Sequence, residues 1–259
     1  MTTDTDRPTD PETSTYVAVA GWDRWMRLAE VSYRRLADAF AALDADAWSR
    51  PTPCEGWTVR DLAGHLVGAM RSAASLRESA SQQFTAMRRA KSDGVDVDVA
   101  LTALQLERTA DRSPEQLVAE MAELVTPAVR GRAKLPAPLR RMASVRVVMG
   151  DIDERWTMDY FLGCILTRDA WLHRIDLADA LGVDPALEAV DREVVGDVAV
   201  EWARRHGRPV ALHLTGEVGG TLVAGEDGDD LELDAIEFCR VLSGRSRHDH
   251  PLLATSVPF

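Results

Sequence analysis

Residues 43–70 read LDADAWSRPTPCEGWTVRDLAGHLVGAM, and the helical character of the chain can be inferred from them. The first half contains two prolines and a glycine, which predict a connector over 49–57. The second half opens at Thr58, and Asp61 three residues later completes the pattern of a capping box. Apolar residues then recur every three or four positions, which is typical of a buried helix face. The stretch therefore predicts an amphipathic helix of a bundle, with His65 among its apolar residues.

The rest of the chain continues this helical pattern. Apolar periodicity predicts helices at about 17–47, 58–87, 100–110, 114–131, 158–181 and 190–205. One start is well marked, because Ser113 can cap the helix, Pro114 suits its first position and Gln116 completes a capping box. One end is marked by Gly182, a residue type that commonly terminates helices. We therefore expect an N-terminal part made of packed helices.

A different pattern begins after Arg208. The apolar runs 209–216 and 221–225 predict a β-hairpin, and a brief strand then leads into a helix near Asp234. The expected fold is therefore mainly α with a small α+β part. We expect a disordered tail over 1–15, a metal-binding helical bundle over 16–185 and a small α+β domain over 186–259.

The composition narrows the classes of function. The 259 residues include 42 acidic and 30 basic ones, and a net charge of −12 without a basic stripe argues against a nucleic-acid partner. No apolar run approaches the roughly 18 residues of a membrane span, and the polar start is unlike a signal peptide. We expect a cytoplasmic monomer or homodimer. The three cysteines, Cys54, Cys164 and Cys239, are too few and too separated for a disulfide framework or a four-cysteine zinc site.

Two helices carry residues that can bind a metal ion. His65 lies among the apolar residues of one predicted helix, while Asp169 and His173 are four residues apart and share a face of another. Asp176, three residues further, could orient His173 through its other ring nitrogen. Three protein ligands would leave a coordination position open, as in catalytic rather than structural zinc sites. The alternatives are a buried core histidine at 65 and a solvated ion pair at 169 and 173.

Three blocks of sequence resemble one known family. Residues 43–70, then LTRDAWLHRIDLADALG at 166–182, then DAIEFCRVLSGR at 234–245 are similar in this order to the mycothiol-dependent maleylpyruvate isomerase family. That family lies within the DinB-like four-helix-bundle superfamily. The resemblance spans about residues 17 to 250, and it implies a DinB-like bundle followed by a small α+β domain.

The resemblance also implies a ligand set. Family members bind a divalent metal, usually zinc, and the motif histidine corresponds to His65. The second motif, typically Glu-x-x-x-His, falls on Asp169 and His173, so this chain has an aspartate where glutamate is usual. The metal recruits the thiol of mycothiol, a low-molecular-weight thiol of actinobacteria, and a metal-bound thiol is deprotonated at neutral pH.

The implied activity is that of an isomerase or a thiol S-transferase acting on a small electrophile, such as an unsaturated carboxylate. Arg240 and Arg245 match the C-terminal motif and are candidates for binding a substrate carboxylate. The alternative for both is a surface arginine near a helix C-terminus. Trp57 is the tryptophan expected closest to the cofactor pocket.

Two other functions remain open on this scaffold. The open metal position could hold water in a hydrolase, or the metal could stabilise a non-catalytic binding or sensor protein. Cys54 lies in the connector just before the helix of His65 and could be near the site, but a structural role is favoured because no histidine lies beside it in the sequence. Cys164 and Cys239 are expected to pack in the core. Neither the substrate nor the metal is identified by the sequence.

Overall fold

The protein was analysed as a computed structural model, which describes residues 15–149 and 152–259. The expected disordered tail lies, except for residue 15, outside the described residues. The described chain forms two compact units: residues 20–186 with 258–259, and residues 15–19 with 187–257. Within the described part of the chain, no helix is long and apolar enough to cross a membrane.

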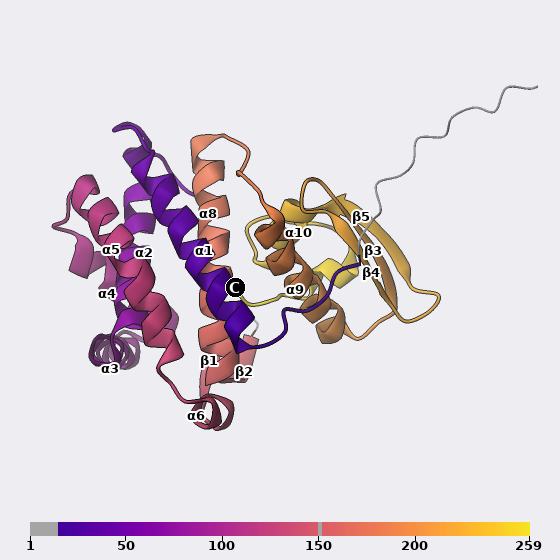
Figure 1. Ribbon diagram of the computed structural model, residues 1–259, viewed down its shortest axis with the longest axis horizontal. Coiled ribbons are helices and arrows are strands. Elements are labelled where there is room, and N and C mark those ends of the chain that lie inside the picture. The colour runs from indigo at the N-terminus through magenta and orange to yellow at the C-terminus, as the bar shows by residue number, and fades with distance from the viewer. Residues whose placement is uncertain (1–14, 150–151) are drawn as a thin grey trace, which may run out of the picture. The chain divides into compact units, whose positions relative to one another are not determined.

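The larger unit is a four-helix bundle with two further helices on one side. Its main helices, which run side by side in Figure 1, are α1 (Trp22–Ala41), α2 (Val59–Ala74), α5 (Pro114–Ala133) and α8 (Leu166–Leu181). α1 and α2 each pack on both α5 and α8, and α2 also packs on α3 (Leu76–Asp93) and α4 (Val97–Thr109). The core is built from the apolar faces that the periodicity predicted; it includes Leu36, Phe40, Leu62, Leu66, Met70, Leu117 and Met121.

Helix ends follow local chemistry. Thr58 and Asp61 form the predicted capping box at the start of α2, and Ser113 and Gln116 form the one at the start of α5. Gly182, with a φ of 69°, ends α8 as expected, since glycine adopts the left-handed region without strain. These local predictions are confirmed.

Two helix predictions were too long. The first helix ends at Ala41, and a short 3-10 turn (Ala47–Ser49) follows after Asp44 accepts a hydrogen bond from the Ala47 amide. The second ends at Ala74, because Ser75 is extended and its hydroxyl caps the separate helix α3. The periodicity did not reveal either break because apolar residues continue on both sides of each one.

The segment before α8 contains two strands that were not predicted from the sequence. After α6 (Ala137–Met142), β1 (Ser144–Met149) pairs antiparallel with β2 (Ile152–Thr157), and Trp156 of β2 packs with Ile165. A short helix α7 (Met158–Tyr160) and one π-helical turn, η2 (Phe161–Ile165), lead into α8. The predicted helix over 158–181 is therefore a composite of three segments.

The smaller unit contains a three-stranded sheet and two main helices. β3 (Val210–Thr215) lies between β4 (Gly220–Ala224), with which it is antiparallel, and β5 (Asp229–Asp234), with which it is parallel. α9 (Ala189–His206) packs on β4, and α10 (Ala235–Leu242) packs on β3 and β5; a 3-10 turn, η3 (Pro251–Ala254), follows. The predicted hairpin and the helix near Asp234 are present, so the fold is mainly α with a small α+β part.

Candidate metal centre

His65 and the pair Asp169 and His173 come from facing helices of the bundle. His65 lies on the second turn of α2, whose start is fixed by the capping box, and Leu62 and Leu66 beside it are fully buried. Asp169 lies on the first turn of α8 and His173 one turn later. α2 and α8 pack against each other, which brings the two sequence motifs together.

The donor atoms of these three residues converge. One ligand atom from each of His65, Asp169 and His173 lies within 4.8 Å of the other two. Among these atoms, Nε2 of His173 lies 3.3 Å from Oδ1 of Asp169. Ligands that share one zinc ion at about 2.0–2.2 Å lie roughly 3–3.5 Å apart, so small side-chain movements suffice to bind an ion. Two imidazoles and a carboxylate suit zinc and its first-row neighbours.

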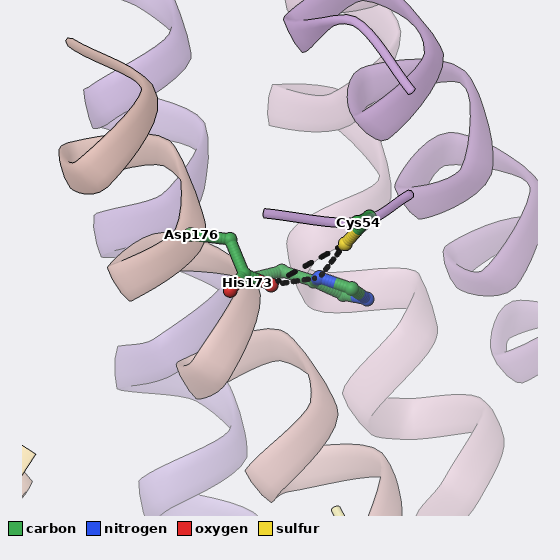
Figure 2. Close-up of side chains that lie close together, drawn as sticks. All are labelled: Cys54, His173 and Asp176. Atoms are coloured by element: carbon green, nitrogen blue, oxygen red, sulfur yellow. Dashed lines mark hydrogen bonds and ion pairs between the residues drawn. The ribbon is translucent and has the colours of Figure 1, made fainter. Parts of the chain in front are cut away.

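The other edge of the His173 ring faces a second set of groups. Nδ1 of His173 lies 2.9 Å from Oδ2 of Asp176, and the Cys54 thiol lies 3.6 Å from the same oxygen. Figure 2 shows the Cys54 sulfur and the Asp176 carboxylate together at this edge of the ring. Asp176 therefore takes the position that was predicted for an orienting carboxylate, and Nε2 of His173 is left facing Asp169.

Burial differs across the site. The side chain of His173 is 7 % exposed and that of Asp176 only 1 %, whereas that of Asp169 is 28 % exposed. The alternative of a solvated Asp169–His173 pair therefore does not describe His173, which is buried. The Asp169 carboxylate is therefore partly accessible to solvent, whereas the His173 ring is not.

The two histidines have opposite pKa shifts. Burial lowers the pKa of His65 to about 4, although the Asp169 charge opposes this effect. Burial also acts to lower the pKa of His173, but the charge of Asp169 and hydrogen bonds to Asp169, Asp176 and Cys54 raise that pKa well above its ordinary value. His65 is thus a neutral imidazole at pH 7, the form that binds metals.

Trp57 lines the same region. Its ring centre lies 5.1 Å from that of His65 and 6.4 Å from that of His173, and the rings of the two histidines meet edge to face at 5.2 Å. The connector places Trp57 here through its backbone, since the Trp57 carbonyl accepts a hydrogen bond from the Thr52 amide. The indole therefore forms part of the wall of the candidate centre.

The two candidate arginines belong to the smaller unit. Arg240, on α10, forms an ion pair of 3.6 Å with Glu237, and its carbonyl accepts the amide of Arg245 at 2.8 Å. The guanidinium of Arg245 reaches the carbonyl of Ser243 at 3.5 Å. These contacts are local to the end of α10, and the predicted binding of a substrate carboxylate stays a prediction. Cys164 and Cys239 are buried as expected.

Two features near the centre go beyond the expectations from the sequence. For Cys54 a structural role was favoured over a place near the site, and its sulfur lies 3.9 Å from Nδ1 of His173. The available signal was its position in the connector, four residues before the Thr58 cap of α2. The second feature is Arg132 of α5, which is 1 % exposed and donates to the carbonyls of Leu162 and Gly163 and to the Thr167 hydroxyl. No periodicity argument predicts a buried arginine.

The comparisons with known proteins now identify the family. The model of the mycothiol maleylpyruvate isomerase N-terminal domain matches residues 29–178, which include all three candidate ligands. The chain belongs to the mycothiol-dependent maleylpyruvate isomerase family. No curated protein matches the chain.

Crystal structures of the mycothiol-dependent maleylpyruvate isomerase show the same fold. The crystal structure of the mycothiol-dependent maleylpyruvate isomerase aligns with a TM-score of 0.56 at 14 % identity, over 88 % of this chain and 90 % of that one. A mutant form of that isomerase gives the same values. YfiT from Bacillus subtilis, described as having an unusual four-helix bundle topology, aligns with a TM-score of 0.41 at 15 % identity, over 70 % of this chain and 95 % of that one.

Proposed function

We propose that this family member binds a divalent metal ion, most simply zinc, through His65, Asp169 and His173. The observation that carries the proposal is the convergence of their donor atoms within 4.8 Å of one another. Three protein ligands leave at least one position for an exogenous ligand, as in catalytic zinc sites. Asp169 is one methylene shorter than the glutamate typical of the family motif, and its 3.3 Å approach to His173 supports a role as ligand.

We further propose that the exogenous ligand is mycothiol and that the protein is an isomerase or an S-transferase acting on a small electrophile. A metal ion bound here would hold the cofactor sulfur as a thiolate at neutral pH. Family membership supports this proposal, and so does the position of Trp57, whose ring centre lies 5.1 Å from that of His65. An unsaturated carboxylate fits as substrate, and Arg245 and Arg240 are the proposed carboxylate-binding residues.

The protein's own side chains would supply the surrounding chemistry. Asp176 would accept a hydrogen bond from the Nδ1–H group of His173 and so keep the Nε2 lone pair directed at the ion. The neutral state of His65 at pH 7 lets it bind the ion without first losing a proton. Trp57 would supply an apolar surface beside both imidazoles.

The first test is metal content. The purified protein should contain about one divalent ion per chain, and His65→Ala or His173→Ala should lose it, while the exposed His248→Ala should retain it. Full retention by the first two variants would refute the ligand assignment.

The second test addresses the thiol. Addition of mycothiol to the cobalt-substituted protein should produce a thiolate-to-cobalt absorption band, and turnover of an unsaturated carboxylate should require mycothiol. Turnover of esters or amides without any thiol would instead identify a hydrolase, and an unchanged cobalt spectrum would contradict the proposed cofactor.

A further inference from the structure

A buried amide side chain lies against the helix that carries His65. α4 approaches α2 closely where α2 has glycines: a Cβ atom on Gly68 would lie only 2.7 Å from Cβ of Gln105. Gln105 thus packs directly on the backbone of α2 at Gly68, within one turn of His65. Its side chain is buried, with Gln105 only 3 % exposed. The glycine allows a polar side chain from α4 to reach the face of α2 that contains the ligand.

Gln105 belongs to a hydrogen-bonded chain of two buried amides. Its Nε2 donates to Oε1 of Gln82 at 3.0 Å, and Nε2 of Gln82 donates to the backbone carbonyl of Gly68 at 3.0 Å and to Oε1 of Glu78 at 3.0 Å. Gln82 is 1 % exposed. The donors and acceptors of buried amides normally have hydrogen-bond partners, because a buried donor or acceptor without a partner costs about 1–3 kcal/mol.

The backbone carbonyl of Gly68 fixes the orientation of both amide groups. A carbonyl oxygen can only accept, so the NH₂ group of Gln82 must face Gly68 and its oxygen must face Gln105. The NH₂ group of Gln105 must then face Gln82, which leaves Oε1 of Gln105 as an acceptor directed elsewhere. The orientation of Gln105 is therefore decided two hydrogen bonds away.

At the end of this hydrogen-bonded series, one potential donor atom and one acceptor atom lack partners in the described part of the chain. Nδ1 of His65 and Oε1 of Gln105 are both buried, and neither has a hydrogen-bond partner of ordinary geometry within the described residues. The side chains are nevertheless neighbours, since Gln105 packs on Gly68, which lies one turn from His65 on the same helix. The amide of Gln105 also acts to raise the pKa of His65 against the effect of burial. One atom can donate and the other can accept, so a hydrogen bond between them would satisfy both.

We propose that Gln105 is a positioning residue for His65: its Oε1 accepts a hydrogen bond from the Nδ1–H group, which holds the ring and presents Nε2 to the metal. This inference rests on the metal site proposed above. It assigns to His65 the same arrangement that Asp176 gives His173, with Nδ1 held by the protein and Nε2 directed at the ion. A neutral amide here keeps His65 anchored without adding a second buried charge.

The first experiment measures the tautomer of His65 in the metal-free protein. In a ¹H–¹⁵N long-range correlation spectrum at pH 7, wild-type His65 should carry its proton on Nδ1. Gln105→Met, which keeps the length of the side chain but removes the acceptor, should shift the proton toward Nε2. An Nε2 proton in the wild type, or the same tautomer in both proteins, would overturn the inference.

The second experiment measures zinc affinity by competition with a chelator. Gln105→Met should weaken zinc binding by about 10- to 100-fold, the usual effect of losing a group that orients a ligand. Gln105→Glu keeps the acceptor and should stay within about threefold of the wild type, because carboxylates also orient zinc-bound histidines. Thr109→Val is the matched control: Thr109 is buried on the same helix, but its hydroxyl bonds only to carbonyls of α4, so zinc affinity should not change.

A merely structural role predicts a different order. Gln105→Glu places a charge in the interior and should be the least stable variant in urea unfolding, so zinc affinity that simply followed stability would fall most in that variant. Equal zinc affinity in Gln105→Met and wild type would also overturn the inference. A wild type that binds no zinc would refute the proposed function instead, and the tautomer measurement would still decide the role of Gln105.

Discussion

Nδ1 of His173 lies 2.9 Å from Oδ2 of Asp176, three residues further along α8, and both side chains are almost completely buried. An aspartate that is 1 % exposed loses nearly all contact with water, which would destabilise the fold without compensating partners. The His173 ring and the Cys54 thiol are two of those partners. The pair therefore fixes the ring that offers its opposite nitrogen to Asp169.

Replacement of Asp176 by asparagine should weaken metal binding while leaving the fold intact. The amide has the shape of the carboxylate but lacks its charge, so His173 loses its charged partner and zinc affinity should fall by about 10- to 100-fold. Asp179→Asn, an exposed aspartate on the same helix, is the control and should leave affinity unchanged. Chelator competition measures both, and equal affinities would show that Asp176 does not orient the ligand.

The shorter carboxylate at position 169 gives a second prediction. Asp169→Asn should lower zinc affinity by at least about 100-fold, because the ion loses its charged ligand. Asp169→Glu restores the residue typical of the family motif and should retain binding with an altered cobalt absorption spectrum. If the asparagine variant binds zinc as tightly as the wild type, Asp169 is not a ligand.

The opposite pKa shifts predict a difference in the metal-free protein. At pH 7, His173 should be protonated and His65 neutral, and His65 should titrate near pH 4 in NMR spectra. The charged groups facing His173 are Asp169 and Asp176, with Cys54 beside them. Two histidines that titrate together near pH 6.5 would contradict the described environment.

The same shifts have opposite effects on stability. His65 has a folded pKa below its unfolded value of about 6.5, so it destabilises the native state as the pH falls from that value toward about 4. The raised pKa of His173 stabilises the native state below about pH 6.5, and this contribution is lost as the pH rises through the folded value. In urea unfolding of the metal-free protein, His65→Gln should therefore lose less stability than the wild type between about pH 6.5 and 4.

The buried Arg132 should be essential for stability. Its guanidinium donates to the carbonyls of Leu162 and Gly163 in the π-helical turn and to the Thr167 hydroxyl. Arg132→Met would leave these acceptors unmatched and should lower the free energy of unfolding by about 2–5 kcal/mol. Arg130→Met, on the exposed face of the same helix, should change it by no more than about 0.5 kcal/mol. Urea denaturation compares the two, and similar values would refute this role.

The helical elements were largely predictable because their signals are local. The capping boxes at Thr58 and Ser113 and the stop at Gly182 depend only on residues within one turn. The break at Ser75 and the pairing of β1 with β2 were not predicted, since each depends on packing that periodicity does not contain. The same holds for the π-helical turn, whose freed carbonyls are matched by an arginine about 30 residues earlier in the sequence.

The sequence by itself determined which residue types were available to a metal: an imidazole on one amphipathic helix and an Asp-x-x-x-His pair on another, because helical spacing sets which side chains share a face. The tertiary structure decided the surroundings of those residues. It brought Cys54 to the His173–Asp176 pair and Gln105 to the helix of His65, over 119 and 40 residues of chain respectively. Such contacts arise from the packing of helices distant in the sequence, where burial makes each hydrogen bond strong and each unmatched polar atom costly.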